Sequence, residues 1–145
     1  MTFKILKEDL FFSEAEALGH GVNVKGVMGA GIAVIFKKKF PEMFEEYKKL
    51  CKDGVLLPGG CSLHFCNNKK IFNLAIKDHW KDFATYKSLY SSICKMKELA
   101  KENKISNIAL PLVGGGLGGL KKEKILSIKK EIFEDSDINL SVYVL

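Results

Sequence analysis

The sequence contains no arginine, so all 23 of its basic residues are lysine. Arginine binds phosphate or guanine through two parallel hydrogen bonds, a geometry that lysine cannot reproduce. Any anion site must therefore use backbone amides or single ammonium groups. The net charge of +6 permits contact with nucleic acid. However, the lysines occur in scattered clusters such as Lys37–Lys39 and Lys121–Lys122, which is typical of a solvated surface and argues against tight, sequence-reading binding of nucleic acid.

Long apolar runs are also missing. No stretch approaches the roughly 18–20 residues needed to cross a membrane, and the first residues lack the charged-then-apolar layout of a signal peptide. We therefore expect a cytoplasmic protein with no membrane partner. The four cysteines, Cys51, Cys61, Cys66 and Cys94, form no C-x-x-C pair and have no histidine at zinc-finger spacing. We expect buried free thiols, no disulfide, no metal and no cofactor.

The 145 residues fit one domain, residues 1–145, with a sizeable core. Apolar runs of strand type alternate with amphipathic helical patterns. The pattern predicts strands at Phe3–Leu6, Ala17–Asn23, Cys61–Cys66, Lys70–Ile76, Ile108–Val113 and Asn139–Leu145, and helices from Ala30 to Lys39, over Glu42–Lys52, Tyr86–Asn103 and Lys121–Phe133.

This alternation favours an α/β sandwich, with a mostly parallel sheet and one antiparallel hairpin around Asn67-Asn68. Ligands of such sheets bind beyond the carboxyl ends of the strands. Asp9, Lys77 and two glycine-rich loops all directly follow predicted strands. We expect them to converge on one edge of the sheet.

The two glycine-rich loops lie in His20–Ala33 (HGVNVKGVMGAGIA) and Leu110–Leu120 (LPLVGGGLGGL). Glycine lets backbone amides crowd together, and a helix N-terminus adds unpaired N–H groups and a positive dipole end. The pair of loops predicts a cradle for a diphosphate. The alternative is two tight turns that are glycine-rich for packing.

Four side chains are candidates for chemistry. Lys77 ends an apolar strand, and loss of water around a lysine favours its uncharged, nucleophilic form; a solvated strand-end lysine is the alternative. Asp9 could accept a hydrogen bond from an exocyclic amine such as that of adenine, or cap a helix. His79 and Trp80 could act as a base and a stacking surface, or simply pack.

Together these pieces resemble the macrodomain family, in particular the class of terminal ADP-ribose protein glycohydrolase and the DNA ADP-ribosyl glycohydrolase antitoxins. The resemblance covers nearly the whole chain. It rests on DLF at Asp9–Phe11, MGAGIAVIFKKKF at Met28–Phe40, Lys77 with the following Thr85-Tyr86, GGGLGGL at Gly114–Leu120, and the terminal VYVL. It implies a three-layer α/β/α fold with a mixed, mostly parallel sheet that binds ADP-ribose.

By position, the resemblance places Asp9 and Leu10 beside the adenine, Asn23 near the distal ribose, and the two loops around the diphosphate and that ribose. Lys77 matches the family lysine that attacks the anomeric carbon of the distal ribose. The full set of expected ligand-binding residues is Asp9, Leu10, His20, Asn23, Met28, Gly29, Ala30, Gly31, Ile32, Thr85, Val113, Gly114, Gly115, Gly116, Leu117, Gly118 and Gly119.

The chain departs from the protein-directed pattern at Gly118, where that pattern has an aspartate. The DNA-directed antitoxins resemble this sequence there, with GLGGL, and also carry a lysine closely followed by His-Trp. The missing acid favours a nucleobase linkage and leaves open what resolves a lysine adduct; Asp78, Asp82 and His79 are the substitutes.

The leading hypothesis is therefore a monomeric ADP-ribosyl glycohydrolase that removes mono-ADP-ribose from DNA bases or glutamate side chains, with DNA left open as a partner contacted without sequence specificity. The alternatives are a non-catalytic ADP-ribose reader and an O-acyl-ADP-ribose deacylase. Which linkage is cleaved stays open.

Overall fold

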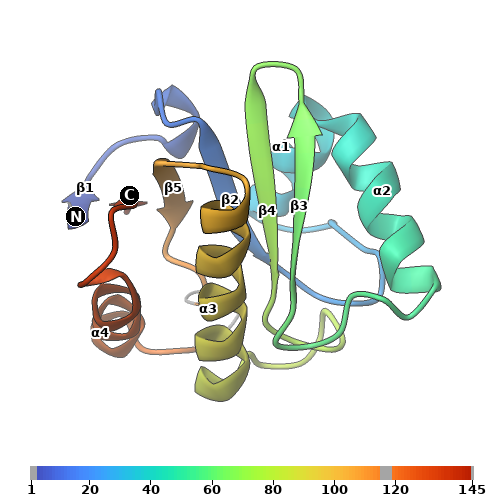
Figure 1. The fold of residues 1–145 in the computed structure, drawn as a ribbon. Coiled ribbons are helices and arrows are strands. Elements are labelled where there is room, and N and C mark those ends of the chain that lie inside the picture. The colour runs from blue at the N-terminus through green and yellow to red at the C-terminus, as the bar shows by residue number, and fades with distance from the viewer. Residues whose placement is uncertain (1–2, 115–118, 145) are drawn as a thin grey trace.

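The computed structural model describes residues 3–114 and 119–144, which form a six-stranded mixed sheet between two layers of helices (Figure 1). The elements in chain order are β1 (Phe3–Leu6), a 3-10 helix η1 (Leu10–Phe12), β2 (Ala17–Val22), α1 (Ile32–Lys39), α2 (Pro41–Lys52), β3 (Cys61–Cys66), β4 (Lys69–Ala75), α3 (Tyr86–Glu102), β5 (Asn107–Pro111), α4 (Lys122–Phe133) and β6 (Asn139–Tyr143).

The sheet has the strand order β1-β6-β5-β2-β4-β3. Every neighbouring pair is parallel except β3 and β4, which form the expected hairpin. Asn67 turns that hairpin at φ 45°, in the left-handed region that asparagine tolerates better than most residues. The three-layer α/β/α architecture with a mixed, mostly parallel sheet is confirmed.

The apolar core lies on both faces of the sheet. Helices α3 and α4 cover one face and α1 and α2 cover the other (Figure 1). Leu89, Ile93 and Met96 of α3 are fully buried on the first face, as are Phe36 of α1 and Met43 of α2 on the second. Because both faces are covered, the strands are apolar on both sides and only their ends can present polar groups.

Several element boundaries differ from the predicted ones for local reasons. Helix α1 begins at Ile32 rather than Ala30, because Gly31 precedes it at φ 59° and ψ −143°. Strand β5 ends at Pro111 rather than Val113, because the Val113 N–H donates to the Pro111 carbonyl in a three-residue turn. The short helix η1 was not predicted; its N-cap is Asp9, whose Oδ1 accepts from the Phe11 N–H at 3.0 Å.

Gly19 and Gly21 lie within β2, where a glycine often marks the close approach of another backbone. The atoms nearest to an added Cβ are instead side-chain atoms: Leu110 Cδ2 at 2.5 Å for Gly19, and Ile76 Cδ1 at 2.7 Å for Gly21. These glycines therefore let side chains of neighbouring strands reach into the sheet.

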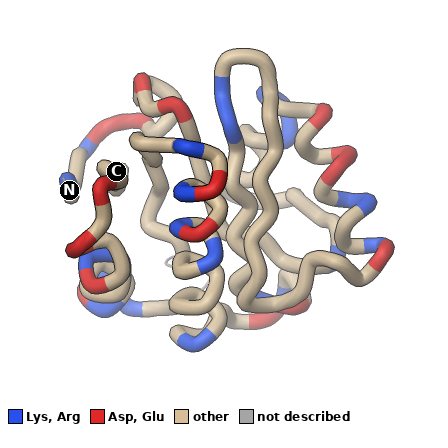
Figure 2. Tube along the Cα trace, viewed as in Figure 1, with Lys and Arg blue, Asp and Glu red and all other residues tan. Residues whose placement is uncertain are grey.

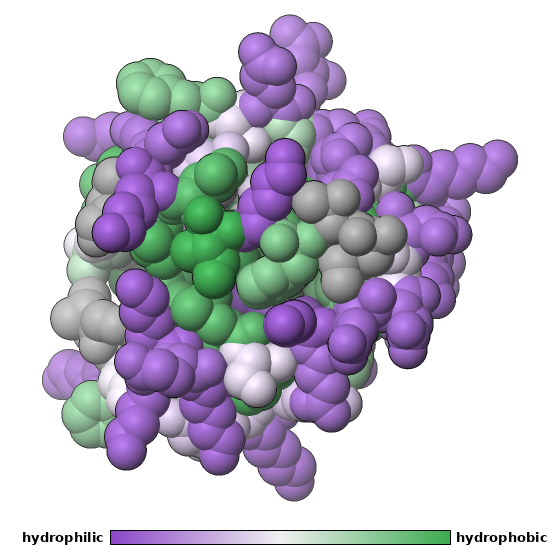
Figure 3. All heavy atoms as spheres, turned by 90° about the vertical axis from the view of Figure 1, so that its left-hand side faces the viewer, coloured by the Kyte–Doolittle hydropathy of each residue, from purple (hydrophilic) through white to green (hydrophobic). Residues whose placement is uncertain are grey.

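The surface is charged and largely mixed in sign. In the view of Figure 2, lysines on α2, α3 and α4 are interspersed with acidic residues. On the flank that carries β1, apolar side chains gather in one area ringed by hydrophilic ones (Figure 3). No helix in the described ranges is long and apolar enough to cross a membrane.

Candidate functional site

Two cavities lie beyond the carboxyl ends of the parallel strands. The first has a volume of about 510 Å³, and its wall combines the loop after β2, the end of β4 and the loop after β5. The second, of about 460 Å³, is lined by residues around η1, α1 and the end of β6. Ile32, Pro111 and Leu112 line both cavities. The two cavities are therefore adjacent and form one elongated cleft.

Most of the expected site residues lie on the wall of this cleft. The first cavity is lined by Asn23, Met28, Gly29, Ala30, Gly31, Ile32, Lys77, Val113 and Gly114. The second is lined by Asp9 and Leu10. Residues that follow different strands in the sequence thus lie together at one edge of the sheet, as predicted from the order of strands and helices.

Three expected residues, His20, Thr85 and Gly119, lie off the wall of the cleft, the first two for clear structural reasons. The His20 side chain is fully buried, its Nε2 lies 2.7 Å from Asn73 Oδ1, and its ring stacks on Phe36 at 3.8 Å between centroids. Burial lowers the pKa of His20 to about 3. Thr85 is exposed and caps α3, since its hydroxyl accepts from the Ser88 N–H at 3.0 Å. Neither His20 nor Thr85 lines the cleft, because each serves local structure instead.

The described residues include only part of the second glycine loop. Gly115, Gly116, Leu117 and Gly118 lie outside the described residues. Gly114 lines the first cavity at φ 91°, and its carbonyl accepts from the Leu120 N–H at 2.9 Å, which closes the loop at its base. Gly119 has φ 78° and does not line either cavity; its Cα faces the exposed ring of Phe83.

Lys77 follows β4 and its side chain is partly buried in the wall of the first cavity. Its ammonium group donates to the carbonyl oxygen of Trp80 at 3.3 Å. Trp80 lines the same cavity with its side chain 47% exposed. A nucleophile candidate and a flat aromatic surface therefore share one wall of the cleft.

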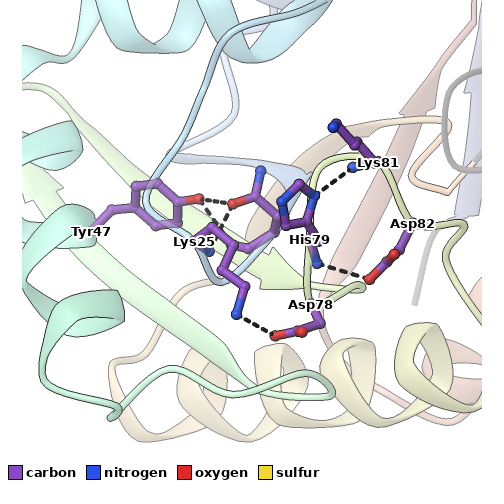
Figure 4. Close-up of polar contacts among 7 residues, drawn as sticks. Lys25, Tyr47, Asp78, His79, Lys81 and Asp82 are labelled. Carbon is purple, nitrogen blue, oxygen red and sulfur yellow. Dashed lines mark hydrogen bonds and ion pairs between the residues drawn. The ribbon is translucent and has the colours of Figure 1, made fainter.

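The loop that carries Lys77 is held by its own polar groups (Figure 4). The His79 N–H donates to Asp82 Oδ2 at 3.1 Å, and His79 Nδ1 accepts from the Lys81 N–H at 3.1 Å. Asp78 pairs with Lys25 at 3.3 Å, and its carbonyl accepts from the Val24 N–H at 3.1 Å. These contacts fasten the loop after β4 to the loop after β2.

The three proposed substitutes for the missing acid are thus engaged in loop structure. None of Asp78, His79 and Asp82 lines either cavity in the described part of the chain. His79 comes nearest, because its ring packs at 3.7 Å between centroids against Trp80. With Nδ1 accepting a hydrogen bond, neutral His79 carries its proton on Nε2.

Tyr47 of α2 supports the wall of the cleft from behind. Its buried hydroxyl lies 2.8 Å from the Asn23 carbonyl oxygen and 2.9 Å from Asn23 Oδ1. Asn23 Oδ1 also accepts from the Lys25 N–H, and Asn23 Nδ2 donates to the Val27 carbonyl. Both the oxygen and the nitrogen of the Asn23 side-chain amide therefore stabilise the loop after β2. Helical apolar spacing alone could not distinguish this tyrosine from packing.

All four cysteines are free, and only Cys66 is buried. Among the described residues no group of three or more histidine, cysteine or acidic side chains could hold a metal ion. The cleft consequently offers backbone amides, lysine and aromatic groups to a ligand.

Comparison with known proteins agrees with this architecture. The chain is 33% identical over 144 residues to human ADP-ribose glycohydrolase OARD1, covering 97% of this chain and 90% of that protein. The structure of the macrodomain of Mycobacterium tuberculosis DarG has a TM-score of 0.94 at 31% identity, covering 98% of this chain and 97% of that one.

The structure of Thermosipho africanus DarTG in complex with ADP-ribose has a TM-score of 0.92 at 25% identity, covering all of this chain and 42% of that one. The chain spans 40% of the length of the curated mycobacterial DNA ADP-ribosyl glycohydrolases, to which it is 32% identical over 93% of its own length. A family model for the Macro domain matches residues 20–128. The chain belongs to the macrodomain family.

Proposed function

We propose that the protein is an ADP-ribosyl glycohydrolase that uses Lys77 as its nucleophile. The observation that carries the proposal is that Lys77, Gly29–Gly31 of the first glycine loop and Val113–Gly114 of the second line one cavity beyond the strand ends. The relatives named above as glycohydrolases, and the related structure that holds ADP-ribose, support the same ligand class.

The cleft fits the parts of ADP-ribose in order. The second cavity, with Asp9 and Leu10, would take the adenine, and Gly29–Ile32 would meet the diphosphate with backbone amides at the start of α1. The distal ribose would then lie in the first cavity beside Lys77. This assignment needs no arginine, in agreement with the composition.

In the proposed reaction, the uncharged amine of Lys77 attacks the anomeric carbon of the distal ribose. The bond from that carbon to the modified base or carboxylate breaks, and the leaving group departs with the bonding electron pair. Water then hydrolyses the lysine adduct, which releases ADP-ribose and restores the amine. The negative diphosphate nearby stabilises positive charge that develops on the ribose.

We further propose that nucleobase-linked ADP-ribose is the preferred substrate. Trp80 presents an exposed face in the cavity next to Lys77, and His79 packs against its ring. Phe83 is 77% exposed beside Gly119 at the base of the second glycine loop. Aromatic faces of this kind stack on bases without reading sequence, at roughly 1–3 kcal/mol per base. The bases of a single DNA strand could stack on both rings, Trp80 and Phe83.

The test is hydrolysis of four ADP-ribosyl linkages, to thymidine, guanine, glutamate and serine, by wild type and Lys77→Ala. Lys81→Ala is the matched control, because Lys81 is an exposed lysine of the same loop that does not line the cavity. We expect Lys77→Ala to lose hydrolysis and Lys81→Ala to keep it. Trp80→Ala should slow release from the two bases more than release from glutamate.

Full activity of Lys77→Ala on every linkage would refute the lysine mechanism. Tight ADP-ribose binding by wild type without release from any linkage would identify a reader instead. Faster hydrolysis of O-acyl-ADP-ribose esters than of any glycosidic bond would identify a deacylase.

A further inference from the structure

Helix α4 carries the one buried lysine of the described residues. The Lys129 side chain is 0% exposed, and its ammonium group donates to the Pro111 carbonyl oxygen at 2.9 Å. No described carboxylate forms an ion pair with it. Lysine is almost never fully buried without a charged partner, because an unpaired charge in the protein interior is strongly unfavourable. A nearby negative charge would stabilise this ammonium group, and the described part of the chain supplies none.

The carbonyl that Lys129 contacts belongs to the cleft. Pro111 lines both cavities, and Val113 and Gly114 line the first. The Pro111 carbonyl also accepts from the Val113 N–H at 2.9 Å, and so forms the tight turn that starts the second glycine loop. Lys129 and Val113 thus share one acceptor. The ammonium group lies directly behind the cleft wall, one peptide group away from the space where a ligand would lie.

The elements that pack on α4 place no paired negative charge beside the Lys129 ammonium group. Strand β5 carries no titratable residue, β6 carries only Tyr143, and the only one on β1 is the exposed Lys4. Helix α3 carries the exposed Glu98 and Glu102, neither of which forms an ion pair with Lys129. Its Lys97 donates to the Ile132 carbonyl of α4. Burial lowers the pKa of Lys129 to about 7. In the empty cleft, burial therefore favours the uncharged form of Lys129 more than it would for an exposed lysine.

We propose that Lys129 is a positioning residue for the diphosphate of the ligand, which it opposes through the Pro111–Gly114 segment, and that it takes up a proton when the ligand binds. A dianion on the far side of one peptide group favours the charged form of a buried lysine, since little water screens the two. The proton comes from solvent, and no bond to the ligand forms. The inference rests on the ADP-ribose ligand proposed above and not on turnover.

Calorimetric titration of the whole chain with ADP-ribose near pH 7.5, in buffers of different ionisation enthalpy, counts the protons taken up. We expect net proton uptake on binding of ADP-ribose by wild type and none on binding of adenosine, which has no phosphate. Lys129→Met should take up none and bind ADP-ribose about tenfold more weakly, a change of roughly 1.4 kcal/mol. Its adenosine affinity should equal that of wild type. Lys130→Met, at the exposed neighbouring lysine, should match wild type throughout.

Lys129→Arg separates the effect of a positive charge on affinity from the uptake of a proton on binding. Arginine stays protonated at all relevant pH values, so this variant should keep more of the ADP-ribose affinity than Lys129→Met but show no proton uptake. Should Lys129→Met fail to fold, Lys129→Arg decides, because proton uptake that persists in Lys129→Arg assigns the proton to another group.

The inference is overturned if wild type takes up no proton with ADP-ribose, or if the uptake persists in Lys129→Met. It is also overturned if Lys129→Met weakens ADP-ribose and adenosine equally, since that result marks a purely structural lysine. Because calorimetry detects binding alone, a lack of hydrolysis refutes the proposed reaction without changing this result.

Discussion

Gly31 gives the sharpest test of the first glycine loop. It precedes α1 at φ 59° and ψ −143°, a backbone conformation that essentially only glycine adopts. A Cβ added to Gly31 would have no heavy atom within 4 Å. Gly31→Ala therefore causes no steric clash, and its whole effect comes from the backbone.

Two results of Gly31→Ala follow from this geometry. Holding alanine in this conformation costs about 1–3 kcal/mol, which lowers the melting temperature of a domain of this size by roughly 2–4 °C per kcal/mol. If the loop relaxes instead, the amides at the start of α1 turn away from the first cavity. A relaxed loop must return to the strained conformation before its amides can meet the ligand, so we expect ADP-ribose affinity to fall at least about tenfold, or roughly 1.4 kcal/mol.

Gly54→Ala is the matched control. Gly54 has φ 69°, also has no atom within 4 Å of an added Cβ, and lies in the turn after α2 away from both cavities. Thermal unfolding should show both variants destabilised, whereas calorimetry should show weaker ADP-ribose binding only for Gly31→Ala. Wild-type affinity of a destabilised Gly31→Ala would show that this loop does not hold the diphosphate.

Two further predictions concern the support behind the cleft. Tyr47→Phe removes the hydroxyl that holds Asn23, so we expect a loss of about 1–2 kcal/mol in urea unfolding together with weaker ADP-ribose binding; unchanged stability would contradict the role given to this contact. Burial lowers the pKa of His20 to about 3. Below about pH 6.5, His20 therefore binds a proton in the unfolded chain but stays neutral in the folded chain. The free energy of unfolding should therefore fall as pH drops from 7 to 5, with His20 contributing up to about 1.4 kcal/mol per pH unit; an equal slope in His20→Gln would show that other groups cause it.

The fold could be predicted because its signals are local. Alternating strand and helix patterns, Pro41 at the first turn of α2 and Asn67 in the hairpin each act through neighbouring residues. The convergence of Asp9, Lys77 and the two loops could also be predicted, since parallel strands end at one edge.

The supporting residues could not be predicted, because their roles depend on contacts distant in sequence. Tyr47 reaches Asn23 across 24 positions, and His20 reaches Asn73 across 53. Lys129 stands on the apolar side of α4, four positions after Ile125, but only the folded chain shows that it reaches Pro111. Helical spacing distinguishes Lys129 from the exposed Lys130, but spacing does not reveal which group the buried ammonium contacts.

The most direct test of the account is chemical trapping of the lysine adduct. Attack by an amine on the anomeric carbon, followed by opening of the ribose ring, gives an imine that borohydride reduces to a stable secondary amine. Mass spectrometry of the protein, mixed with ADP-ribosylated thymidine and borohydride, should locate ADP-ribose on Lys77 and find none in Lys77→Ala. Efficient hydrolysis by wild type with no adduct on Lys77, or with the adduct on another lysine, would contradict the assignment.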